Sequence, residues 1–192
     1  MAIDIPSIIT AFIALFIVMD PISSVPVFVT LTKSYKPEKK AEAARIATLV
    51  ATGVLFGFLF AGSFVLSIMG IRMESFQIAG GIIMLLISIS YALGIEFSPN
   101  HKHTPVEAVI IGVPLLAGPG VMLTTLLMSS TIGLENVAIA AIGVCLSSYA
   151  ILVLSSHIYR IIGGKGLEIL ARVMGVLLAA FAVEYIRRGF GL

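Results

Sequence analysis

Charged side chains are scarce in this sequence. Only 11% of its 192 residues are Asp, Glu, Lys or Arg, whereas 59% are hydrophobic, and the mean hydropathy is +1.12. Soluble globular domains carry about 25% charged residues and about 45–50% apolar ones. The scarcity of charge therefore excludes an ordinary soluble domain. It predicts a single integral membrane domain over residues 1–192 that lies in a lipid bilayer.

Cysteine, net charge and metal ligands are also sparse. Cys145 is the only cysteine, which excludes an intrachain disulfide framework. The net charge of +2 is too small and too scattered to indicate a nucleic-acid partner. His101 and His103 lie two residues apart without further ligands nearby, so we expect no metal and no cofactor. Asp4 precedes the first apolar stretch instead of the basic residues of a signal peptide, which predicts a retained first span.

The motifs of intramembrane hydrolases are missing. A zinc hydrolase needs the pattern His-Glu-x-x-His, which the chain does not contain. An aspartyl hydrolase needs two facing carboxylates, and a serine hydrolase of the usual kind has a Gly-x-Ser-x-Gly turn. Neither arrangement is present, although Ser23, Ser24, Ser129 and Ser130 keep a serine type formally open. We therefore expect that the protein is not an enzyme, with a hydrolase as the less favoured alternative.

Long apolar runs dominate what is present, and they predict an all-α protein with six transmembrane helices. The predicted spans are Ile5–Thr32, Ile46–Ile71, Ser75–Ile95, Thr104–Leu134, Asn136–Tyr159 and Glu168–Arg188. Nine of the twelve Lys and Arg residues fall on one side of these spans. The nine are Lys33, Lys36, Lys39, Lys40, Arg45, Lys102, Arg160, Lys165 and Arg172. The positive-inside rule then predicts a multi-pass protein of the cell membrane with both termini outside.

The first span contains a polar, helix-breaking stretch, Asp20-Pro-Ile-Ser-Ser-Val-Pro26. As an unbroken helix the 28 residues of this span would measure about 42 Å, against about 30 Å of hydrocarbon. Pro21 and Pro26 remove backbone donors, and Ser23 and Ser24 offer the backbone local hydrogen bonds. We predict a break here. An aspartate within a span indicates a functional site, although a simple helix-capping role for Asp20 stays open.

A second break repeats the pattern. Pro114-Leu-Leu-Ala-Gly-Pro119 has the same spacing between prolines as the first break and lies 93 positions later. Gly81 and Tyr91 recur 94 positions later as Gly175 and Tyr185. Three spans per half place the second copy in the membrane in the opposite direction, which predicts two inverted three-helix repeats with spans one and four broken. The repeats are approximately residues 1–96 and 97–192.

The chemistry of the two breaks predicts a site for a small zwitterion. The adjacent apolar spans offer Asp20 no Lys or Arg, so its carboxylate is either protonated or paired with a mobile cation: a proton, Na⁺ or a substrate ammonium. At the second break the backbone amides near Gly118 open a half-helix whose dipole favours a carboxylate. The predicted binding residues are Asp20, Pro21, Ser23, Ser24, Pro26, Pro114, Ala117, Gly118, Pro119 and Gly120.

Four motifs in order resemble those of the MarC family, six-span membrane proteins related to the LysE-type exporters. The motifs are Asp20-Pro-x4-Pro26, Phe76-x-Ile-Ala-Gly-Gly81, Pro114-Leu-Leu-Ala-Gly-Pro-Gly120 and Arg172-x-Met-Gly-x-Leu-Leu-Ala-Ala180. The resemblance implies a secondary transporter that moves small neutral amino acids such as glycine and alanine, coupled to protons. The chain has Ser23-Ser24 where the family usually has Gly-Asn. A passive small-solute pore and a homo-oligomer both stay open.

Overall fold

The structure is a computed structural model that describes residues 3–94, 116 and 118–191. All regular elements of these residues are helices, as the composition predicts. They are α1 (Ile5–Met19), α2 (Ser24–Leu31), α3 (Pro37–Ile68), α4 (Met73–Leu93), α6 (Pro119–Ile132), α7 (Leu134–Val153) and α8 (Ser155–Gly189). The predicted start of the fourth span at Thr104, together with Pro114 and Ala117, lies outside the described residues.

Four helices, α3, α4, α7 and α8, are long and apolar enough to cross a membrane. The pair α1 and α2 passes the same test as one span bent by 50°, which makes five candidate spans. Helix α6 is apolar but has only 14 residues. The prediction of an all-helical membrane protein is therefore confirmed, with four to five candidate spans in the described part of the chain.

The predicted break in the first span is confirmed at Asp20. This residue ends α1 with φ 44° and ψ 61°, a left-handed conformation that a non-glycine residue seldom adopts. Its N–H still donates to the carbonyl oxygen of Phe16 at 3.0 Å, so α1 stays regular to its last turn. Pro21 follows at once and cannot extend the helix. The chain therefore leaves the axis of α1 and starts α2 at Ser24 in a new direction.

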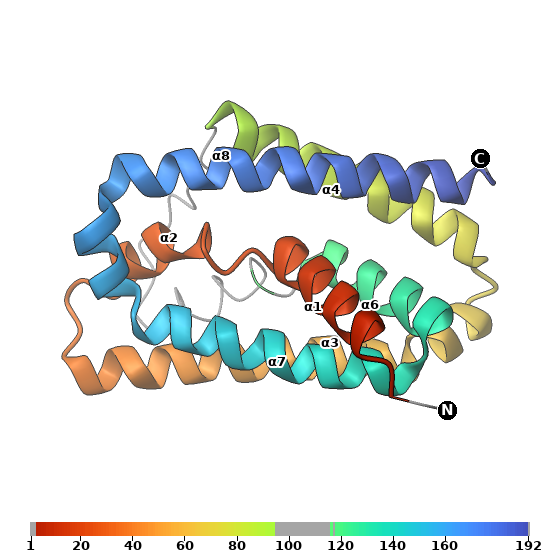
Figure 1. The fold of residues 1–192 in the computed structure, drawn as a ribbon, viewed down its shortest axis with the longest axis horizontal. Helices are drawn as coiled ribbons and strands as arrows, with labels where there is room; N and C mark the ends of the chain where they lie inside the picture. Colours follow the sequence, from red (N-terminus) through yellow and green to blue (C-terminus); the bar gives the residue numbers. More distant parts are fainter. Residues whose placement is uncertain (1–2, 95–115, 117, 192) are drawn as a thin grey trace.

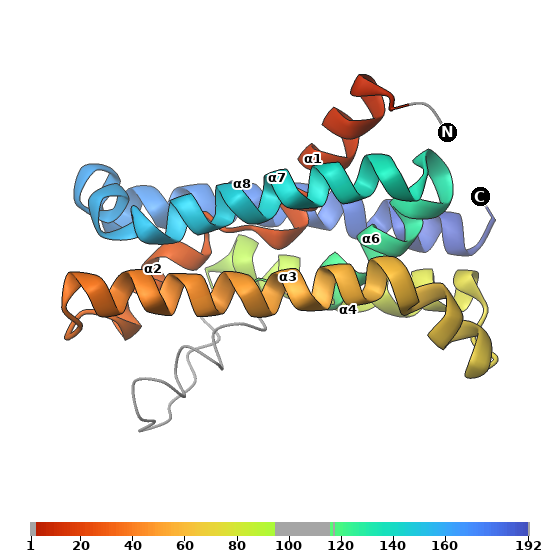
Figure 2. The same cartoon turned by 90° about the horizontal axis from the view of Figure 1, so that it is seen from below.

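The helices lie lengthwise in one bundle, with both chain ends at the same end of it (Figure 1). Helices α3 and α7 run side by side in opposite directions, and so do α4 and α8 (Figures 1 and 2). Helix α1 packs mainly on α7 and α6, whereas α2 packs mainly on α8. The broken first span therefore crosses between two different parts of the bundle.

Two glycines allow α4 and α8 to approach closely. A Cβ placed on Gly81 would lie 2.9 Å from the carbonyl oxygen of Ala182. A Cβ on Gly175 would lie 2.9 Å from the backbone nitrogen of Ala92 and 3.0 Å from the carbonyl oxygen of Ser88. Each glycine thus faces the backbone of the opposite helix. Small residues at such positions are the usual means by which membrane helices pack tightly.

We expect Gly175→Ala to destabilise the protein by about 1–3 kcal/mol, because the added methyl group must push α4 away from α8. Thermal unfolding of the purified protein in detergent measures the loss. Gly53→Ala is the matched control, since a Cβ there meets no heavy atom of the described residues within 4 Å. If Gly175→Ala is as stable as Gly53→Ala, the close approach is not important for stability.

The basic stretch Lys33–Arg45 predicts a loop in which Pro37 suits the first turn of the next helix; the structure confirms this position of Pro37 but extends the helix over most of the stretch. Helix α3 begins at Pro37 and includes most of these cations. Pro37 suits the first helical position because its missing N–H would have no helical partner there. Lysine and glutamate are good helix formers, so charge marks the limit of the apolar span but does not end the helix.

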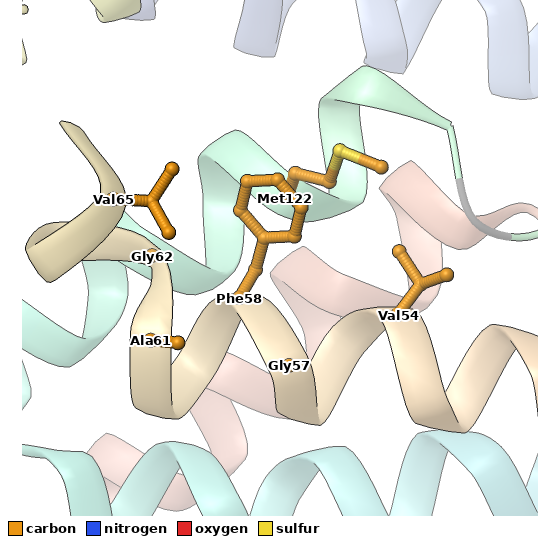
Figure 3. A pocket seen from close by; sticks show the side chains of 7 residues that line it. All are labelled: Val54, Gly57, Phe58, Ala61, Gly62, Val65 and Met122. Carbon is orange, nitrogen blue, oxygen red and sulfur yellow. The ribbon is translucent and has the colours of Figure 1, made fainter. Parts of the chain in front are cut away.

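Gly53, Gly57 and Ala61 have the four-residue spacing typical of close helix packing. In the described part of the chain, however, Gly57 and Ala61 line an open apolar groove of about 250 Å³. Its walls come from α3, and Met122 of α6 closes one side (Figure 3). The spacing predicts a contact with another helix, but no described residue lies within 4 Å of a Cβ placed on Gly53 or Gly57, whereas Gly62 contacts Leu126 of α6.

Span five was predicted to run to Tyr159, but α7 ends at Val153. Helix α8 then begins at Ser155 and contains a break at Gly163, where φ is 73° and ψ is 164°. The part before this break, Ser155–Ile162, runs across the bundle instead of along it (Figure 1). We call it the crosswise segment. The long part of α8 after Gly163 contains the predicted sixth span.

Candidate functional site

Asp20 is buried, with 5% of its surface exposed. One oxygen of its carboxylate, Oδ1, accepts a hydrogen bond from the backbone N–H of Ser23 at 3.2 Å. The hydroxyl of Ser24 donates to the carbonyl oxygen of Asp20 at 3.2 Å. These bonds close the turn between α1 and α2. The geometry thus gives Asp20 a capping role, which is the alternative that the sequence left open.

Capping does not account for the charge of this carboxylate. Among the described residues, no Lys, Arg or His comes within ion-pair distance of Asp20. The ion pairs of these residues all lie within α8: Arg172 with Glu168, and Arg187 and Arg188 with Glu184. A buried carboxylate without a cationic partner is costly in a membrane. Its second oxygen is therefore a natural acceptor for a proton or a ligand cation.

The two serines of the break have different roles. The Ser24 hydroxyl has a partner in the turn, whereas the buried Ser23 hydroxyl has none among the described residues. Ser23 is 8% exposed, and its hydroxyl lies beside the Asp20 carboxylate. A buried polar atom without a partner costs about 1–3 kcal/mol. Ser23 is thus the serine that remains available to a ligand.

Helices α4 and α7 supply further polar groups near this break. Tyr91 of α4 lies within electrostatic range of the Asp20 carboxylate. Ser148 of α7 is completely buried, and its hydroxyl oxygen lies 3.2 Å from the sulfur of Met19. The sequence indicates Tyr91 only through the repeat, and no sequence pattern indicates Ser148. The first break is therefore surrounded by polar atoms from three parts of the chain.

The prolines shape the first break. Pro21 is buried in the turn, and Pro26 lies in the first turn of α2, where a missing N–H breaks no helical hydrogen bond. Neither ring carries a polar atom that could bind an ion. Of the residues predicted at this break, Asp20 and Ser23 therefore retain unused polar groups, while Pro21, Ser24 and Pro26 hold the backbone.

The described part of the second break is the start of α6. Gly118 precedes this helix with φ −67° and ψ 172°, and no side chain caps it. Pro119 occupies the first helical position, and the carbonyl of Gly118 accepts the N–H of Val121 at 3.0 Å. The amide end of α6 is thus uncapped by any described side chain. Such an end favours an anion.

The structure brings the described start of α6 against the end of α1. A Cβ on Gly120 would lie 2.8 Å from Cγ1 of Val18 and 3.1 Å from Cγ of Met84. Val18 is two residues before Asp20, so the first turn of α6 contacts the last turn of α1. The same contact leaves no space for a side chain at Gly120. The first turn of α6 therefore packs directly against α1 and α4 at this point.

A hydrogen bond between α8 and α6, one turn after Gly120, was not predicted. The hydroxyl of Tyr185 on α8 donates to Oγ1 of Thr124 on α6 at 2.9 Å, and both residues are almost fully buried. Thr124 lies one turn after Gly120. The offset of 94 positions from Tyr91 is a sequence signal for Tyr185, but no sequence pattern identified Thr124.

The N-terminal end of α1 is attached to the start of α7. Asp4 caps α1 by accepting the N–H of Ser7 at 3.1 Å. Its own N–H donates to Oδ1 of Asn136 at 3.1 Å, and Nδ2 of Asn136 donates to the carbonyl oxygen of Ile132 at 2.8 Å. Further along, the ring of Phe12 lies against Gly143 of α7. These contacts connect α1 to α7 over most of its length.

Comparison with known proteins places these features in a wider group. The family model described as "MarC family integral membrane protein" matches residues 5–191. A UPF0056 membrane protein of Methanocaldococcus jannaschii, MJ1677, is 34% identical, with 97% of each chain covered. The UPF0056 inner membrane protein YhgN of Escherichia coli is 32% identical, with 92% of each chain covered. No solved structure matches the chain.

Proposed function

The chain belongs to the MarC family of integral membrane proteins, and we propose that it is a secondary carrier that moves small neutral amino acids across the cell membrane. Glycine and alanine are the proposed substrates, and protons are the proposed coupling ion. One observation carries the proposal: a buried aspartate at a helix break, without a cationic partner among the described residues, lies close to the amide end of a second half-helix.

The two ends of a zwitterion fit the two breaks. An ammonium group donates hydrogen bonds, and both the Asp20 carboxylate and the Ser23 hydroxyl can accept them. A carboxylate accepts hydrogen bonds from the free amides at the start of α6 and is favoured by the helix dipole. The small residues of the second break and its contact with Val18 favour a substrate without a large side chain. When no substrate is bound, a proton on Asp20 would neutralise the same charge.

The proposed architecture has six spans arranged as two inverted repeats. The antiparallel course of α4 and α8 supports it, because Gly81 and Gly175 are equivalent in the repeat and face each other's helices. The opposite directions of α3 and α7 support it as well. Both termini lie at one end of the bundle, and the distribution of Lys and Arg favours the outside for that end.

Uptake into proteoliposomes tests the function. We expect radiolabelled glycine and alanine to accumulate when a pH gradient is imposed, and the initial rate to saturate with substrate. Empty liposomes control for leakage. A rate that rises linearly with concentration would indicate a passive pore, and absence of uptake in either pH direction would contradict the proposal.

The two serines of the first break provide a sharper test. We expect Ser23→Ala to weaken glycine binding about 10- to 150-fold, because a hydrogen bond to a charged group contributes about 1.5–3 kcal/mol. Ser24→Ala is the matched control: it removes the bond to the Asp20 carbonyl and should lower stability without changing affinity. Glycine titrations by calorimetry and by thermal shift separate the two effects. Equal affinity in both variants would exclude Ser23 from the site.

A further inference from the structure

The crosswise segment has a polar face and an apolar face. On a helix, Ser156 and Arg160 are four residues apart and share one face with His157. Ile158, Ile161 and Ile162 share the opposite face by the same spacing. Ile161 is 71% exposed and Ile162 is 42% exposed. The segment is therefore amphipathic, and much of its apolar face is not covered by the described protein.

The direction of this segment places it where a membrane surface would be. It lies at the end of the bundle opposite the two termini and connects α7 to the long part of α8 (Figure 1). In the perpendicular view it is seen nearly end-on, while α7 and α8 run lengthwise (Figure 2). Gly163 makes this turn possible through its positive φ. An amphipathic helix perpendicular to the spans is typical of the boundary between headgroups and acyl chains.

The start of α3 adds positive charge to the polar face. The ammonium nitrogen of Lys40 lies 3.2 Å from the hydroxyl oxygen of Ser156, which joins two parts of the chain 116 residues apart. Lys36 and Lys39 lie within one turn of Lys40, and Arg160 lies one turn from Ser156. None of these cations forms an ion pair with a carboxylate of the described residues, although Glu38 and Glu42 are on the same turns of α3.

We propose that the start of α3 and the crosswise segment form a binding site for an anionic phospholipid. Lys40 and Arg160 hold the headgroup phosphate, since clustered Lys and Arg beside membrane helices attract acidic headgroups. Arg160 can also bind phosphate oxygens through two donors. The acyl chain covers the exposed Ile161 and Ile162. This combination of cations and exposed isoleucines favours a lipid over a free anion, which would leave the apolar face in water.

Thermal unfolding of the full chain in detergent micelles tests this site. We expect added phosphatidylglycerol to raise the melting temperature by about 5 °C, and phosphatidylcholine to have little effect. The double variant Lys40→Gln with Arg160→Gln should lose most of the shift, and so should Ile161→Ser, which leaves the cations in place. Arg72→Gln, at the other end of the bundle, is the matched control and should keep the full shift.

Two results would overturn the proposal. An unchanged shift in both the double variant and Ile161→Ser would place the lipid elsewhere. An equal shift with glycerol phosphate, which has no acyl chain, would show that the site takes a free anion. If the double variant does not fold, Arg160→Gln and Ile161→Ser decide the question, because each changes one exposed side chain.

Discussion

Proton-driven accumulation of glycine is expected to disappear in the variant Asp20→Asn, down to the level of empty liposomes. The asparagine amide does not take up or release a proton at the pH values of an uptake experiment, so the variant cannot couple substrate movement to a pH gradient. The amide also removes the negative charge that would attract an ammonium group. Uptake of radiolabelled glycine into proteoliposomes, with and without a pH gradient, measures the effect.

The local structure makes this substitution informative. Asparagine can accept the N–H of Ser23 through its own Oδ1, and it tolerates the positive φ of position 20. We therefore expect the melting temperature to change by no more than about 4 °C, or about 1 kcal/mol for a chain of this size. Asp20→Ala is the control, because it removes the cap as well and should lose about 0.5–2 kcal/mol of stability.

An unchanged rate and an unchanged pH response in Asp20→Asn would contradict the proposed role. In that case the hydrogen bond to Ser23 would be the complete explanation for an aspartate at this position. The melting temperature of the same preparation shows whether a loss of uptake comes from a loss of folding.

The second large effect is expected from Gly118→Val, which should abolish detectable glycine binding. A branched side chain at the N-cap of α6 would cover the amides proposed to hold the substrate carboxylate. The backbone at Gly118 has φ −67° and ψ 172°, an extended conformation that valine adopts readily. Folding should therefore be retained, and calorimetric titration with glycine measures the loss.

Gly120→Val separates this effect from simple crowding. Its side chain would collide with Val18 and Met84, so we expect a loss of about 1–3 kcal/mol of stability. Gly118→Val should unfold near the wild-type temperature, whereas Gly120→Val should unfold well below it. Normal glycine affinity in a folded Gly118→Val protein would contradict a role for the amides of α6.

The main features of the fold could be predicted because they depend on local energetics. Burying charge in lipid is costly, so composition identifies the membrane spans, and two prolines with an aspartate identify the break at Asp20. Pro37 indicates the start of α3, whereas apolar character alone does not, because a helix can continue into water. The direction of the crosswise segment was missed for a similar reason: hydropathy is the same whether a helix runs through a membrane or along its surface.

For the candidate site, the sequence predicts which residues share a turn but does not predict most of the contacts between distant helices. Asp20 and Ser23 lie in one turn, so the sequence itself places them together. The hydrogen bond between Tyr185 and Thr124 joins residues 61 positions apart, and it depends on how α8 packs near α6. At Gly53 and Gly57 the spacing suits helix packing, but no described residue lies within 4 Å of a Cβ placed there, since spacing alone does not specify which segment is the neighbour.

The attachment of α1 to α7 has a mechanical consequence. Asp4 and Asn136 fix one end of α1 to α7, whereas α2 packs mainly on α8. A displacement of α7 relative to α8 would therefore act mainly on the backbone torsions between Asp20 and Ser23. The ionisable group of the first span is located in this hinge. If a change in the hinge angle alters the proton affinity of Asp20, protonation of Asp20 must also shift the equilibrium between hinge angles. Thermodynamic reciprocity makes the two coupling free energies equal.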